Sequence, residues 1–295
     1  MSESNKRNFI VHGSILAIAG ILVRIIGMLY RIPVVNIIGS EGNGIYGAAF
    51  NIYNIMLVLS SYGLPMAVSK LVSARFTKKR YKSAAKVLRC SLMVAVCTGG
   101  IAALLVFFGA SFIENVIYGG GLPGLAVPLR ILAPTIFLVA ILGVIRGFFQ
   151  GQSTMIPTAV SQILEQIVNA IVSIAAGYGM MKAFASSPDV AAYGAAGSTL
   201  GTAMGALTAV LFMGFLYAVY TPTFNRLKRK DRHTENQSTG QICKIIIYTM
   251  IPIILGQTFY QISALIDDVM FSNIMVGRDT VSYTHLRAHE TTLHL

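Results

Sequence analysis

Apolar stretches long enough to cross a lipid bilayer recur along the whole chain, and they constrain its fold more than any other feature. A helix of about 20 apolar residues spans the hydrocarbon core of a membrane. A soluble domain could not bury this many such segments, so the sequence predicts a polytopic membrane protein. The seven predicted segments are residues 9–33, 45–74, 86–110, 125–149, 156–181, 191–219 and 244–274.

These segments are expected to be helices, so the predicted fold class is all-α. Strands of a membrane barrel would alternate in polarity over about 10 residues, whereas these runs are longer and unbroken. Charged residues make up only 12% of the chain, against about 25% in a soluble domain. The first segment is not read as a signal peptide, because it is too long, lacks a small-residue cleavage site and contains Arg24.

Basic residues are distributed unevenly between the two ends of the predicted helices. An excess on one side is the positive-inside signature, which predicts a cytoplasmic N-terminus and cytoplasmic even-numbered connections. The net charge of +12 does not indicate a nucleic-acid partner, because topology and anionic membrane lipids explain the basic loops better. The three basic residues on the outer side are Arg31, Arg130 and Lys182. The sixteen on the cytoplasmic side are Lys6, Arg7, Arg75, Lys78, Lys79, Arg80, Lys82, Lys86, Arg89, Arg146, Arg226, Lys228, Arg229, Lys230, Arg232 and Lys244.

Glycine and proline predict where the helices turn, bend and pack. The stretch GSEGNGIYG (residues 39–47) is expected to form a turn between the first two helices. It is not a phosphate-binding loop, since no strand precedes it and it lacks GK[ST]. Pro65, after Gly63, and Pro134 predict kinks. The small residues of the sixth segment predict close helix packing.

No cysteine pattern suggests a metal, cofactor or thiol chemistry, because Cys90, Cys97 and Cys243 are scattered. The last fifteen residues, VSYTHLRAHETTLHL, are suddenly polar, and His285 and His289 have a spacing that could place two metal ligands on one helix face. This tail also resembles translated adaptor or misassembly sequences at the ends of metagenomic gene models. We therefore expect residues 281–295 to be non-native and unpacked, with native sequence continuing through at least five more membrane helices.

Polar side chains inside the apolar segments form the candidate functional site. On the fifth segment, Gln162, Glu165, Gln166, Asn169 and Ser173 share one helix face. An ionisable residue within a membrane is costly and normally faces a polar interior, so we expect a hydrated cavity. The alternative is that these side chains only hydrogen-bond neighbouring helices together. The cavity candidates are Arg24, Asn51, Asn54, Arg146, Gln150, Gln162, Gln166, Asn169, Gln257 and Gln261, and the ion-coupling candidates are Glu165, Asp267 and Asp268.

Three blocks of this sequence resemble the stage V sporulation protein B branch of the polysaccharide flippases. This family belongs to the multidrug/oligosaccharidyl-lipid/polysaccharide exporter (MOP) superfamily, and the resemblance covers residues 9–280. The blocks are GSILAIAGILVRIIGMLYRIPVVNIIGSEGNGIYGAAF, SSYGLPMAVSKLVS and LRILAPTIFLVAILGVIRGFFQGQSTMIPTAVSQILEQIVN.

The resemblance implies 12–14 helices in two six-helix lobes around a central cavity. Residues 1–225 would then be the first lobe, 226–243 a basic cytoplasmic linker, and 244–280 the first helix of a truncated second lobe. Arg24 matches the family's cavity arginine in helix one, which would hold the pyrophosphate of a lipid carrier. Arg146 and Glu165 lie in matching blocks, but the resemblance assigns them no role.

The predicted function is a cell-membrane flippase that moves a lipid-pyrophosphate-linked oligosaccharide or peptidoglycan precursor by alternating access. A monomer is expected, with an ion or potential gradient as the energy source, since no Walker motif is present. One alternative is a drug or cation exporter of the same superfamily, which an acid-lined cavity would favour. Another is a non-transporting membrane scaffold. An enzyme is disfavoured, because Asp267 and Asp268 form no DDxxD pattern for magnesium.

Overall fold

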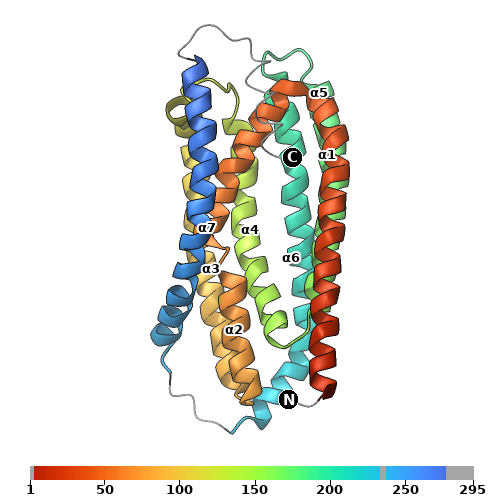
Figure 1. Cartoon of the computed structure of the whole chain (residues 1–295), viewed down its shortest axis with the longest axis vertical. Helices are drawn as coiled ribbons and strands as arrows, with labels where there is room; N and C mark the ends of the chain where they lie inside the picture. The colour runs from red at the N-terminus through yellow and green to blue at the C-terminus, as the bar shows by residue number, and fades with distance from the viewer. Residues whose placement is uncertain (1–2, 233–236, 277–295) are drawn as a thin grey trace.

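A computed structural model describes residues 3–232 and 237–276, and all the regular structure in this part of the chain is helical. The helices lie alongside one another and form an elongated bundle (Figure 1). The predicted all-α fold is therefore confirmed. The elements are α1 (Glu3–Ser60), α2 (Leu64–Thr77), α3 (Tyr81–Phe112), the π-helical turn η1 (Ile113–Ile117), α4 (Ala126–Gly151), α5 (Ile156–Ala183), α6 (Val190–Lys230) and α7 (Thr239–Val276).

Helix α1 contains two membrane-length halves joined at a single glycine. Its 58 residues would extend about 87 Å if straight, far more than the ~30 Å hydrocarbon core. Gly39 breaks the helix with φ 69° and ψ −179°, a conformation that favours glycine because it has no Cβ. Figure 1 shows that the chain rises through the first half of α1 and reverses direction at the upper end of the bundle. The turn predicted over residues 39–47 is therefore confined to Gly39, and the helix resumes directly after it.

The number of membrane-length stretches agrees with the seven predicted segments once this reversal is included. By length and apolar composition, six stretches of the described residues can cross a membrane. The first of them, Gly13–Thr77, is 65 residues long and covers all but the first four residues of the first two predicted segments, together with the Gly39 reversal. The protein is thus a multi-pass membrane protein.

Where Pro65 predicted a kink, the helix is interrupted altogether, whereas at Pro134, the other predicted kink, α4 continues as a helix. Residues 61–63 form a turn, and α2 begins at Leu64 with Pro65 in its first turn. Gly63 also allows α7 to approach, because a Cβ there would lie 3.0 Å from the Cβ of Met250. Prolines also lie within α6 and α7, at Pro222 and Pro252.

The connections that carry the basic residues gather at one end of the bundle. The start of α1, the α2–α3 turn, the α4–α5 connection and the carboxyl end of α6 all lie at the lower end in Figure 1. The reversal in α1 and the connections between η1 and α4 and between α5 and α6 lie at the opposite end. The helices thus alternate in direction as the seven-segment prediction requires.

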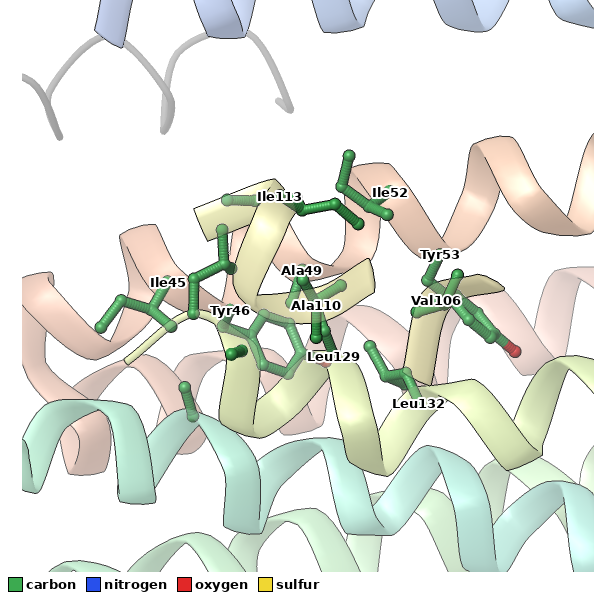
Figure 2. Close-up of a cluster of buried hydrophobic side chains, with 14 of the residues drawn as sticks. Ile45, Tyr46, Ala49, Ile52, Tyr53, Val106, Ala110, Ile113, Leu129 and Leu132 are labelled. Carbon is green, nitrogen blue, oxygen red and sulfur yellow. The ribbon is translucent and has the colours of Figure 1, made fainter. Parts of the chain in front are cut away.

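Two large clusters of buried apolar side chains hold the bundle together. The first joins the second half of α1 to α3, η1 and α4, and Figure 2 shows Tyr46, Ala110 and Leu129 meeting there. The second joins α2, α3, α4, α6 and α7 around Phe148 and Phe224. Lipid tails are as apolar as these side chains, so close van der Waals contact stabilises such clusters in a membrane.

Glycines at four-residue spacing produce the closest helix contacts. The prediction for the sixth segment is confirmed: a Cβ at Gly205 of α6 would lie 2.6 Å from the backbone oxygen of Glu165 in α5. A second case was not predicted. On α4, Gly143, Gly147 and Gly151 face α2, and a Cβ at Gly147 would lie 2.6 Å from the Pro65 oxygen. Small residues at both interfaces let the backbones approach each other.

Candidate functional site

An ion pair between Arg146 of α4 and Glu165 of α5 occupies the middle of the predicted polar region. Arg146 Nη2 donates to Glu165 Oε2 across 2.7 Å, and the two side chains are 14% and 26% exposed. Arg146 Nε also donates to Ser161 Oγ at 2.9 Å. Each charge is therefore neutralised within the bundle, an arrangement that lowers the cost of placing it there.

Farther along α5, the polar face is used for helix packing. The buried Asn169 donates from Nδ2 to the Tyr30 hydroxyl of α1 at 3.3 Å, and its Oδ1 accepts from Ser173 at 2.9 Å. The hydroxyl of Ser173 also lies 2.8 Å from the backbone oxygen of Ser198 in α6, and Thr202 of α6 is 3.5 Å from Asn169 Oδ1. This geometry favours the hydrogen-bonding alternative for Asn169 over a place in a cavity.

Arg24 differs from Arg146, because it makes no ion pair or hydrogen bond with any described residue. Its side chain is exposed on the first half of α1, between apolar neighbours such as Ile21 and Met28, which are 59% and 63% exposed. On the same face, four residues before and three residues after it, are Gly20 and Gly27. A Cβ at Gly20 would meet nothing within 4 Å. The guanidinium therefore has open space beside it.

The contacts between α1 and α5 place two glutamines near Arg24. A Cβ at Gly27 would lie 3.1 Å from Gln166 Nε2, and three residues later Tyr30 meets Asn169. The first half of α1 and α5 therefore run parallel in matched register, which puts Arg24 at the level of Gln162. Gln162 and Gln166 are half-buried, and neither makes a side-chain hydrogen bond within the described chain. We call Arg24, Gln162 and Gln166 the α1–α5 polar face.

The other predicted residues do not join this face. Asn51 and Asn54 are half-buried on the second half of α1, Gln150 is half-buried at the end of α4, and Gln257 is exposed on α7. The backbones of Gln261, Asp267 and Asp268 lie in α7, but their side chains fall outside the described residues, as does the whole tail 281–295. Across residues 3–232 and 237–276, no group of three or more His, Cys, Asp or Glu side chains could hold a metal ion.

Sequence reasoning missed the residues that form hydrogen bonds with the predicted polar side chains. Ser161 lies four residues before Glu165, so the helical spacing of the polar stripe could have included it. Tyr30, Ser198 and Thr202 reach Asn169 and Ser173 from other helices, and no pattern in the chain indicates those pairings.

Comparison with known proteins identifies the family. Residues 10–288 match the family described as "Polysaccharide biosynthesis protein". The chain belongs to this family. It is 34% identical over 176 residues to "Lipid II flippase MurJ" of Bacillus subtilis (strain 168), covering 58% of this chain and 32% of that protein. It is 26% identical over 294 residues to "Stage V sporulation protein B" of the same strain, covering 98% of this chain and 55% of that protein.

The fold is also that of solved MOP superfamily transporters. The outward-facing conformation of a multidrug resistance MATE family transporter aligns with a TM-score of 0.65 at 17% identity, covering 88% of this chain and 54% of that one. At this identity the likeness concerns the fold alone. The chain thus shares the helical membrane architecture of this transporter. The chain spans between about a third and about half of the length of the curated relatives it matches.

Proposed function

We propose that this chain forms the first lobe of a flippase that carries a lipid-pyrophosphate-linked saccharide across the cell membrane by alternating access. In this proposal residues 1–225 are the first lobe, 226–243 are a cytoplasmic linker, and 244–280 begin a second lobe. The family match and the greater length of the relatives support this division. The N-terminus faces the cytoplasm, as the gathering of basic residues at one end of the bundle favours.

The unpaired charge of Arg24 carries the proposal. Inserting a charged side chain at the centre of a membrane costs about 2.5–3.5 kcal/mol on insertion scales, so such a side chain normally faces a partner or a polar cavity. Arg24 has neither a carboxylate nor a hydrogen-bond acceptor among the described residues, and its exposed neighbours Ile21 and Met28 are apolar. An anionic group from outside the lobe is the partner that this arrangement lacks.

A pyrophosphate suits the α1–α5 polar face. Guanidinium presents a planar fork that binds phosphate oxygens in pairs. The amides of Gln162, at the level of Arg24, and Gln166, one turn farther along α5, can donate further hydrogen bonds, while Gly20 leaves room for a bulky headgroup. The second lobe would supply the opposite wall. A cation exporter is less well supported, because Glu165 is already neutralised by Arg146.

Substitution of Arg24 tests the proposal at two levels. Native mass spectrometry of the purified chain with undecaprenyl pyrophosphate should show binding that Arg24→Ala abolishes and Arg24→Lys restores only in part, because a point charge replaces a bidentate fork. Complementation of a flippase-deficient strain by the full-length protein should follow the same order. Arg31→Ala, on the same half of α1 but nearer the break at Gly39, serves as the matched control and should bind like the unmodified chain. Equal binding and equal complementation by Arg24→Ala would refute the proposal.

A further inference from the structure

A basic pocket is lined by residues of α3, α6 and α7. The adjoining ends of these helices lie toward the lower end of the bundle in Figure 1. The volume of the pocket is about 480 Å³, and an adjoining hollow of about 510 Å³ shares Lys82 and Lys228 with it. The cations that line the two are Lys82, Lys86, Arg89, Lys228 and Arg229. Among the described residues, no Asp or Glu lines either one. A phosphate group fits both the charge and the size of this site.

The cations of the pocket are not neutralised by carboxylates of the described chain. Lys86 Nζ donates to the backbone oxygen of Gln237, and Lys228 Nζ lies 5.2 Å from the ring centroid of Phe224. The nearby Asp231 is buried, and its Oδ2 accepts from the backbone N–H of Lys82 at 2.8 Å. Within residues 3–232 and 237–276, the pocket therefore keeps an excess of positive charge that a bound anion would offset.

An apolar stripe continues from the pocket along the same face of α3. Lys82, Lys86, Arg89 and Met93 follow one another at offsets of three or four residues, which places them on one helix face. Beyond Met93 the same spacing leads to exposed apolar side chains. These are Ile101 at 60%, Leu104 at 58% and Phe108 at 76% exposed. The face therefore changes from cationic to apolar along a single helix.

We propose that this pocket binds the headgroup of an anionic phospholipid whose acyl chain lies along the apolar stripe of α3. A basic pocket between helices at the membrane surface is suited to lipid phosphates. The adjacent stripe favours a lipid over a free phosphate, because only a lipid has a chain to place there. The bound headgroup would bridge α3, α6 and the start of α7. This site is on different helices from the α1–α5 polar face and does not depend on the transport proposal.

Native mass spectrometry of the purified chain with phosphatidylglycerol and with phosphatidylcholine tests the site. Phosphatidylglycerol should be retained preferentially. Lys86→Gln/Arg89→Gln/Lys228→Gln should weaken its binding roughly 100-fold, since each cation near an anionic surface contributes about a factor of five. The matched control, Lys78→Gln/Lys79→Gln/Arg226→Gln, removes the same charge outside the pocket and should bind normally.

A single substitution tests the site if the triple variant fails to fold. Arg89→Gln removes an exposed pocket cation that makes no hydrogen bond in the described structure, and it should weaken phosphatidylglycerol binding about fivefold. A competition experiment separates a lipid from other phosphates. Water-soluble glycerophosphoglycerol should not displace phosphatidylglycerol. Unchanged retention in both variants would overturn the site. Equal displacement by glycerophosphoglycerol, or stronger binding of undecaprenyl pyrophosphate in this pocket, would overturn the assignment to a phospholipid.

Discussion

Arg146 of α4 donates to the carboxylate of Glu165 in α5 across 2.7 Å, and this ion pair joins two consecutive helices inside the bundle. The connection between these helices, residues 152–155, is short, so the pair lies close to the end where α4 and α5 meet. The same guanidinium also holds Ser161 of α5. We therefore propose that Glu165 stabilises Arg146 and that the unpaired Arg24 is better placed to meet a substrate.

Glu165→Gln should destabilise the protein, because the substitution leaves the charge of Arg146 partly buried without a counterion. We expect a loss of about 1–3 kcal/mol in the free energy of unfolding, measured as a lower melting temperature in detergent. The double variant Arg146→Met/Glu165→Met removes both charges and should recover most of that stability. If Glu165→Gln melts like the unmodified protein, the ion pair contributes little to stability, and the predicted ion-coupling role of Glu165 is favoured instead.

Asn169→Ala should loosen the contact between α1, α5 and α6. The substitution removes the interhelical hydrogen bond to Tyr30 and the bond within α5 to Ser173, and an interhelical hydrogen bond in a membrane contributes about 0.6–1.7 kcal/mol. A lower melting temperature is expected. Gln162→Ala on the same helix removes an amide that makes no hydrogen bond with the described residues, so its melting temperature should hardly change. Equal effects of the two substitutions would contradict this assignment.

Gly205→Ala should push α6 away from α5. The added Cβ would lie 2.6 Å from the backbone oxygen of Glu165, and backbone atoms cannot move aside without separating the helices. Overpacking of this kind costs about 1–3 kcal/mol. Gly214→Ala is the control on the same helix, because a Cβ there meets nothing within 4 Å. Melting curves that rank the two variants equally would exclude close packing at Gly205.

The membrane orientation is testable by cysteine labelling after Cys90, Cys97 and Cys243 are replaced by serine. Arg80→Cys and Lys230→Cys lie at the basic end of the bundle and should react with an impermeant reagent only in opened cells. Lys182→Cys lies at the end of α5 on the opposite side and should react in intact cells. Labelling of residue 80 or 230 from outside would invert the proposed topology.

The sequence by itself determined the class of structure and the membrane-length stretches of the described residues. Apolar runs of bilayer length leave a helix as the only way to satisfy every backbone group in lipid, and basic residues mark alternate connections. The place of one helix interruption was readable too, since Gly63 and Pro65 predicted a kink where α1 ends and α2 begins. The reversal at Gly39 was predicted as a nine-residue turn, but its location within one residue depended on a single positive φ angle.

Only the tertiary structure decided which polar residues form ion pairs or hydrogen bonds with other described residues and which do not. Helical periodicity predicted one shared face for Gln162, Glu165, Gln166 and Asn169. It could not predict which residues of other helices each of them contacts. Glu165 meets Arg146, and Asn169 meets Tyr30, because separate helices bring these residues together. Arg24 stays unpaired for the same reason: the described helices offer it no carboxylate. A one-dimensional pattern records the face of a helix, while the partner on that face depends on how the helices pack.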